Sequence, residues 1–238
     1  IPTTWLTFAE IWDALLADMP MTAMIRNLAT MTRVGLLTAG SDAAKTVVAR
    51  LGDEARLQKA RVHPIALLAA LTTYKSGHGA RGSGTWAPVA AVVDALDGAF
   101  YHAFKAVEPS GKRTLLALDV SGSMTSGTIA GVPGLTPRIG SAAMALITAA
   151  TERDHQFVAF TAAAGGYGGQ YGGGESGLRP LAISQRQRLD DVCKAVDGLP
   201  FGGTDCALPM LWAERNRVDV DTFVIYTDIE TRAGIVRP

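Results

Sequence analysis

Residues 116–127 read "LALDVSGSMTSG" and pass from an apolar run into an acidic, hydroxyl-rich turn. Asp119, Ser121 and Ser123 stand at alternate positions directly after the apolar run, so one carboxylate and two hydroxyls occur within five residues. Loops that follow strands often carry functional residues. Clustered oxygen donors suit a hard cation, a phosphoryl group or an acyl substrate. The stretch therefore predicts a buried strand that ends in a functional loop.

The segments around this stretch alternate between apolar strands and helices. We expect strands at 114–120, 155–162 and 222–228, and helices at 138–152, 185–199 and 207–218. Continuous apolar strands separated by helices are typical of a parallel sheet covered on both faces. Ligands of such sheets bind beyond the carboxyl ends of the strands. Residues 111–238 are therefore predicted to form a doubly wound α/β domain that lacks its last strands, with a glycine-rich loop at 163–177.

The first hundred residues have a different, helical pattern. Apolar residues recur at helical spacing in the segments 7–19, 20–37, 41–53, 64–75 and 87–107. Ser41 and His63 are suitable N-cap residues, and Pro20 and Pro64 suit a first helical position. The pattern changes at "EPSGKR" (108–113). We expect a mixed fold with an all-α helical-repeat segment over 1–110, which is HEAT-like in its helix lengths, and a chain that is incomplete at both ends.

Composition limits the classes of protein that this chain can belong to. The chain has 238 residues, of which 48% are hydrophobic and 18% are charged, values typical of a globular fold. A formal net charge of +0 gives no global attraction to nucleic acid or to a membrane. No apolar run reaches the roughly 18 residues that span a bilayer, so no membrane partner is expected. The two cysteines form no CxxC pair, which favours a reducing, cytoplasmic location.

Several enzymatic interpretations of residues 116–127 lack the residues that they require. Phosphoryl transfer through Asp119 needs a second carboxylate two positions on, where Ser121 stands. Acyl transfer needs a G-x-S-x-G turn and a histidine, and neither occurs near Asp119. Two G-x-G-x-x-G matches, at 77–82 and 172–177, do not follow a strand and open a helix, so they are not expected to bind a nucleotide. The sequence therefore predicts a protein that is not an enzyme.

The cation interpretation gains from two later loops. Thr204 lies in "FGGTDC" (201–206), and Asp228 lies at a predicted strand end in "YTDIET" (226–231). Together with the first loop they offer two carboxylates and three hydroxyls at one sheet edge, and these donors suit Mg²⁺ or another divalent cation such as Mn²⁺. In the alternative interpretation Ser121 and Ser123 are only turn residues and Thr204 is an N-cap.

A second candidate site is the basic stretch 45–81. It contains seven Lys or Arg residues against two acidic residues, in a chain that is neutral as a whole. Such side chains neutralise phosphates, and glycines allow backbone amides to approach them. The sequence predicts RNA contacts, with His78 and Tyr74 able to stack on bases, at the candidates Lys59, Arg61, His63, Lys75, His78 and Arg81. The alternative is a solvated basic helix face.

Longer segments of the chain resemble a known family. The D-x-S-x-S, Thr-loop and Asp-loop order resembles the metal-ion-dependent adhesion site of von Willebrand factor A domains. The words "ARVHPIALLAALTTYKSGHGARG", "LDGAFYHAFKAVEPSGKR", "LALDVSGSM", "GGTDCALPMLWA" and "YTDIETRAG" are similar to those of TROVE-domain proteins, the family of the Ro ribonucleoprotein autoantigen and its bacterial relatives. The resemblance covers nearly the whole chain except 163–180.

The resemblance implies a scaffold for RNA quality control. In this family a ring of HEAT-like helical repeats is closed by the A domain, binds Y RNAs on its outer surface and takes single-stranded 3′ ends of misfolded non-coding RNAs into its central hole. It also implies metal ligation by Asp119, Ser121, Ser123, Thr204 and Asp228.

The sequence leaves open both the function of the chain and whether the chain is complete. An alternative function is a protein-interaction A domain, whose bound cation receives a partner's carboxylate. Most of the helical array and the last strands of the A domain are absent from these residues, so we expect a fragment or a fold completed by companion chains.

Overall fold

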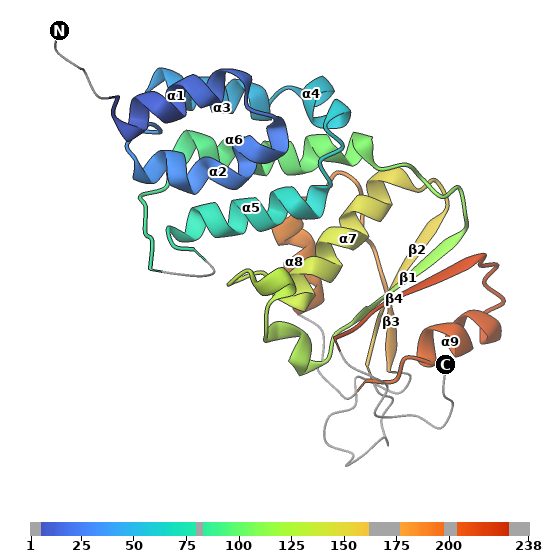
Figure 1. The fold of residues 1–238 in the computed structure, drawn as a ribbon. Helices are drawn as coiled ribbons and strands as arrows, with labels where there is room; N and C mark the ends of the chain where they lie inside the picture. Colours follow the sequence, from blue (N-terminus) through green and yellow to red (C-terminus); the bar gives the residue numbers. More distant parts are fainter. Residues whose placement is uncertain (1–5, 80–82, 162–176, 198–203, 229–238) are drawn as a thin grey trace, which may run out of the picture. The chain divides into compact units, whose positions relative to one another are not determined.

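The computed structural model describes residues 6–79, 83–161, 177–197 and 204–228 (Figure 1). The chain divides into two compact units, the first formed by Ile1–Val107 with Gly131–Gly134 and the second by Glu108–Ala130 with Leu135–Pro238. Arg81 and all of the glycine-rich stretch 163–177 except Gly177 lie outside the described residues. Within the described ranges, no helix has the length and apolar character needed to cross a membrane.

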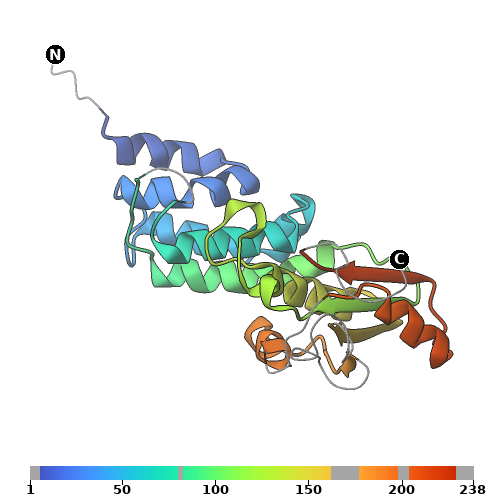
Figure 2. The ribbon, with the colours of Figure 1, turned by 90° about the horizontal axis from the view of Figure 1, so that it is seen from below.

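The first unit consists of helices. They are α1 (Phe8–Asp18), α2 (Met21–Arg33), α3 (Asp42–Leu51), α4 (Glu54–Lys59), α5 (Pro64–Ser76), α6 (Ala90–His102) and the short 3₁₀ helix η1 (Ala103–Ala106). Figure 2 shows α1, α2, α5 and α6 in successive rows within this unit. Leu28, Met31, Leu57, Leu96 and Phe100 are almost completely buried between these helices. The predicted helical fold of the first part is confirmed.

Local capping explains where several of these helices begin. Thr7 and Glu10 form a capping box at α1, and the Ser41 hydroxyl accepts a hydrogen bond from the Ala44 amide at α3. His63 Nδ1 accepts from the Ile65 amide at α5, as the sequence predicts. Two predictions were wrong in detail. Pro20 is the N-cap of α2 and not its first residue, and α2 ends at Arg33 and not at residue 37.

Gly77 is the C-cap of α5 and adopts a left-handed conformation with φ of 73°. A side chain at this position would be strained, and its Cβ would lie 2.9 Å from the Trp86 carbonyl oxygen. The glycine is therefore required both by the backbone conformation and by the close approach of the chain that returns along α5.

The second unit contains a four-stranded sheet within the described residues. Its strands are β1 (Thr114–Asp119), β2 (His155–Phe160), β3 (Leu178–Leu181) and β4 (Thr222–Tyr226), in the order β3-β2-β1-β4. β1 pairs in parallel with both β2 and β4, so their carboxyl ends lie at one edge of the sheet. In the register, Leu118 lies opposite Tyr226 and Asp119 opposite Phe160.

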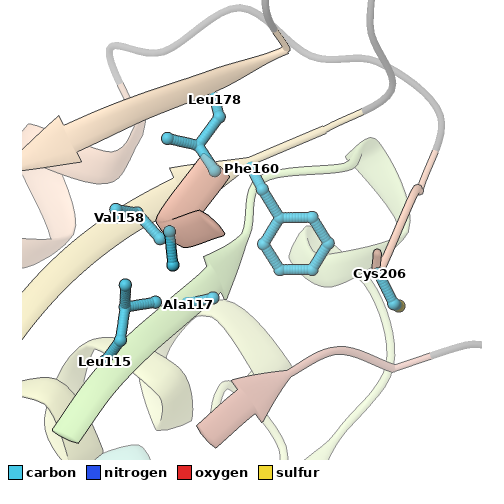
Figure 3. Packing of buried hydrophobic residues seen from close by; sticks show 7 residues of the cluster. Leu115, Ala117, Val158, Phe160, Leu178 and Cys206 are labelled. Atoms are coloured by element: carbon cyan, nitrogen blue, oxygen red, sulfur yellow. The ribbon is translucent and has the colours of Figure 1, made fainter. Parts of the chain in front are cut away.

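Helices cover this sheet and bury β1 at every residue. α7 (Pro137–Thr151) contacts β1 and β2 and packs with α8 (Leu189–Asp197), while α9 (Leu208–Arg215) contacts β2 and β3. Figure 3 shows the cluster on one face, formed by Leu115, Ala117, Val158, Phe160, Leu178, Cys206 and Ala213. The predicted mixed fold, with an α/β second part, is confirmed.

Two elements were missed by the sequence patterns. β3 is antiparallel to β2, so the sheet is mixed and not purely parallel. Its residues, Leu178–Leu181, include an arginine and a proline that are both exposed, so they lack the apolar pattern of a central strand. Helix α4 is only six residues long and buries just one of them, Leu57, which leaves too little periodicity to recognise.

Candidate functional site

Asp119, the last residue of β1, is fully buried and is the centre of a hydrogen-bond network. Its Oδ1 accepts from the Ser121 amide at 2.7 Å. Its Oδ2 accepts from the Thr227 hydroxyl at 2.7 Å and from the Thr204 hydroxyl at 3.2 Å. Three separate stretches of the chain therefore converge on one carboxylate.

The two serines continue this network to a second carboxylate. Ser121 Oγ and Ser123 Oγ lie 3.1 Å apart, and the Ser123 hydroxyl donates to Asp228 Oδ1 at 3.0 Å. Ser121 and Thr204 are buried, whereas Asp228 is exposed. A 3₁₀ helix, η2 (Gly122–Thr125), turns the chain directly after Ser121 and returns Ser123 towards it. The network thus runs from a buried carboxylate to an exposed one at the carboxyl edge of the sheet.

The structure brings together the five residues proposed as metal ligands and adds one that sequence reasoning missed. Asp119, Ser121, Ser123, Thr204 and Asp228 all belong to this network. Thr227 is the addition, and its position between the β4 strand and Asp228 in "YTD" was the available signal. Their assignment to a metal ion stays a prediction.

The donors fit a hard divalent cation. Buried carboxylates normally have an ion-pair partner, and within the described residues no Lys, Arg or His forms an ion pair with Asp119. Among the described residues, no group of three or more His, Cys, Asp or Glu side chains that could hold a metal ion occurs, so a cation here would depend on the hydroxyl oxygens beside the two carboxylates. Carboxylate and hydroxyl oxygens are the donors that Mg²⁺ and Mn²⁺ accept.

A further buried carboxylate, Asp205, lies beside Thr204. Burial raises the pKa of Asp205, and a hydrogen bond from the Ala207 amide opposes that rise. Asp205 is 6% exposed and accepts this bond at 3.1 Å, just before α9. Its visible role is to fix the turn between Thr204 and α9.

The residues proposed for RNA contact lie at the two ends of α5 and do not form one cluster. Lys59, Arg61 and His63 are exposed around the start of α5, and Lys75 and His78 are exposed around its end. His63 also caps α5, so it has a structural role beside any contact with a ligand. Arg81 lies outside the described residues.

The suggested stacking of Tyr74 on a base was wrong. Tyr74 is only 2% exposed because it faces the interior of the helical unit. Its hydroxyl lies 2.8 Å from the Thr32 hydroxyl and accepts from the Val89 amide at 3.2 Å, and its ring stacks on Trp86. The side chain is a buried link between helices and not a surface platform.

Both parts of the chain match domains of known proteins. A family model described as the Ro60 vWA domain matches residues 113–238, and one described as the TROVE domain matches residues 1–73. The chain is 48% identical over 231 residues to the RNA-binding protein RO60 of Deinococcus radiodurans. It is 42% identical over 239 residues to the protein of that name from Caenorhabditis elegans.

The chain spans less than half the length of these relatives. The alignments cover 97% and 100% of this chain but only 41% and 34% of the relatives. The crystal structure of the Deinococcus radiodurans RO (RSR) protein matches with a TM-score of 0.85 and 47% identity, over 96% of this chain and 43% of that one. The similarity therefore extends over both units described above.

Proposed function

This chain belongs to the Ro60 family, and from that premise we propose that it binds RNA as a scaffold of the Ro type and not as a catalyst. The observation that carries the proposal is the match of the Ro60 vWA model to residues 113–238, joined to a TROVE match at 1–73. Its RNA ligands are proposed to be Y-like RNAs and the single-stranded ends of misfolded non-coding RNAs.

The helical unit supplies the charge for such binding. Lys59 and Arg61 lie at one end of α5, and Lys75 and His78 lie at the other. A helix of 13 residues is about 20 Å long at 1.5 Å per residue, so these are two separate contacts. A single strand that runs along α5 would meet both. Contacts of this type position the phosphate backbone and carry no base information.

The second unit is proposed to hold Mg²⁺ or Mn²⁺ at the carboxyl edge of its sheet. Ser121, Ser123 and Thr204 would supply hydroxyl ligands, and Asp119 and Asp228 would balance the charge, partly through water. The support is the convergence of these side chains and the absence of an ion-pair partner for Asp119 among the described residues. When bound, the ion would present a positive charge beside the exposed Asp228.

A second candidate function uses the same edge of the sheet. A cation held beside an exposed residue could accept a carboxylate from a protein partner, with the helical unit serving only as a platform. The local basic stretch 45–81 favours RNA binding, whereas the neutral net charge of the whole chain leaves this alternative open. The two functions differ in their salt dependence, because phosphate contacts release counterions.

RNA affinity measured over a series of salt concentrations tests the proposal. A fluorescently labelled single-stranded RNA should bind with an affinity that falls steeply with salt, both with Mn²⁺ and after chelation. Absence of binding at low salt would contradict RNA binding by this chain. Binding of an acidic peptide only in the presence of Mn²⁺ would instead favour the protein-interaction function.

A further inference from the structure

Arg138 is a buried charged residue that contacts the backbone of the D-x-S-x-S loop. It is the second residue of α7 and is only 3% exposed. Its Nη2 donates to the carbonyl oxygens of Val120 and Ser121, both at 3.1 Å. Arginine is rarely buried this completely unless its guanidinium is paired and hydrogen-bonded.

The same guanidinium reaches a second element. Its Nη1 donates to Asp197 Oδ1 at 3.1 Å, and Asp197 is the last residue of α8. The planar guanidinium fork suits this arrangement, because one side binds two carbonyls while the other binds a carboxylate. Arg138 therefore joins α7, α8 and the end of β1 through hydrogen bonds.

The two carbonyls that Arg138 binds belong to the peptide units that orient the candidate cation donors. The Ser121 carbonyl also accepts from the Met124 amide at 3.2 Å, which closes the η2 turn. The Ser121 amide donates to Asp119 Oδ1 at 2.7 Å. Arg138 thus fixes the backbone from which the Ser121 and Ser123 hydroxyls project, without touching the carboxylates of the site.

On the other side, Asp197 lies seven residues before Thr204 in the sequence. The Thr204 hydroxyl donates to Asp119. The contact of Arg138 with Asp197 therefore ties the first loop to the helix from which the chain proceeds to the second donor loop. One guanidinium thus links the first of the three stretches that build the site to the end of α8.

We propose that Arg138 is a positioning residue for the cation site, which locks the D-x-S-x-S loop to α8 so that the oxygen donors are arranged before a cation binds. The inference rests on the proposed cation site, but its geometric part concerns the cation-free protein. Groups that orient ligands without touching the metal typically change metal affinity by 10-fold to 100-fold when they are removed.

Arg138→Met tests this role, because methionine keeps much of the apolar volume and removes every donor. Calorimetric titration with Mn²⁺ should show affinity about tenfold weaker than in the wild type. Arg138→Lys keeps the charge and some donors and should restore part of the loss. The matched control is Arg113→Met, which removes an arginine paired with Asp219 and Asp221 at the other end of β1 and should leave Mn²⁺ affinity unchanged.

Amide hydrogen exchange in the cation-free protein tests the geometric part independently. Arg138→Met should speed exchange at Ser121 and Met124, whose amides close the loop, whereas Arg113→Met should not. If the wild type binds no Mn²⁺, the cation site itself is wrong, and the exchange comparison still decides whether Arg138 holds the loop.

A second variant covers the case in which Arg138→Met does not fold. The Asp197 side chain is 58% exposed, so Asp197→Ala is expected to fold and should change exchange in the same direction by a smaller factor. Wild-type exchange and wild-type Mn²⁺ affinity in a folded Arg138→Met protein, or in Asp197→Ala if the former does not fold, would overturn the proposal.

Discussion

The sheet edge at Asp119 and the basic residues around α5 are two candidate binding regions with opposite construction. At the sheet edge, side chains from three separate stretches are joined by hydrogen bonds of 2.7–3.2 Å around one buried carboxylate. Around α5, the side chains come from a single stretch and stay exposed. The first arrangement depends on exact placement, whereas the second depends mainly on charge, and the two should respond differently to substitution.

Asp119→Asn is expected to have the largest effect, because it removes the charge at the centre of the network. Mn²⁺ binding should be lost. With Mn²⁺ at 100 times its dissociation constant, the wild type should gain about 2.7 kcal/mol of stability and the variant almost none. Thermal unfolding with and without Mn²⁺ measures both. Asp221→Asn, at the opposite end of the sheet, is the control and should retain the stabilisation by Mn²⁺. If Mn²⁺ stabilises all three proteins equally, Asp119 is not part of the cation site.

Replacing Lys59 and Lys75 together by alanine should weaken RNA binding without changing the fold. If each contacts one phosphate, the slope of log affinity against log salt should flatten by about 1.4. The loss should be similar for RNAs of different sequence. The double variant Lys112→Ala, Lys194→Ala removes the same charge from exposed positions in the other unit and should leave the slope unchanged. If both double variants show the same slope, Lys59 and Lys75 do not contact phosphate and belong only to a solvated helix face.

Tyr74→Phe tests whether Tyr74 stabilises the helical unit or contacts RNA. The change removes the acceptor of the buried Val89 amide and the bond to Thr32, so unfolding free energy should fall by about 1.5 kcal/mol. Urea denaturation measures this loss. Thr32→Val removes the bond to Tyr74 and the bond from the Thr32 hydroxyl to the Leu28 carbonyl, but it leaves the buried Val89 amide its acceptor and should cost less. RNA affinity of the folded Tyr74→Phe protein should match the wild type, and a selective loss of RNA binding would show that the tyrosine contacts the ligand after all.

The smallest effect is expected at Arg113, in the second unit but away from the cation edge. Its guanidinium holds the pKa of the Asp221 carboxyl well below the usual range. Because a depressed carboxyl pKa stabilises the fold above the ordinary value of about 3.9, this contribution is present at neutral pH and is lost as the pH falls below that value. The melting temperature of Arg113→Met should therefore lie slightly below the wild type at pH 7, and the difference should shrink in acid. A difference that is constant with pH would contradict this origin.

The fold was predictable from sequence where the controlling interactions are local. The uninterrupted apolar run before Asp119 predicted a strand buried at every residue, and β1 has that burial. Ser41 and His63 predicted the starts of α3 and α5, because an N-cap needs only the side chain and an amide two or three residues later. Prediction failed at β3 and α4, where short length left no periodicity to detect.

The sequence also indicated which residues could form the candidate cation site, but it did not show how they come together. The order of Asp119, Ser121, Ser123, Thr204 and Asp228 indicated oxygen donors on loops. Thr227 was missed, since only the parallel register of β1 and β4, with Leu118 opposite Tyr226, brings the residues after each strand together.

The sequence by itself determined the order of the longer helices and strands, the types of donor atom and the positions of the basic residues, because these follow from neighbours within a few residues. The tertiary structure alone decided that Tyr74 is buried, that Thr227 reaches Asp119 and that Arg138 links the loop to α8. Each of these contacts joins residues far apart in the chain. Their formation depends on strand register and on the burial of intervening side chains, which no local pattern specifies.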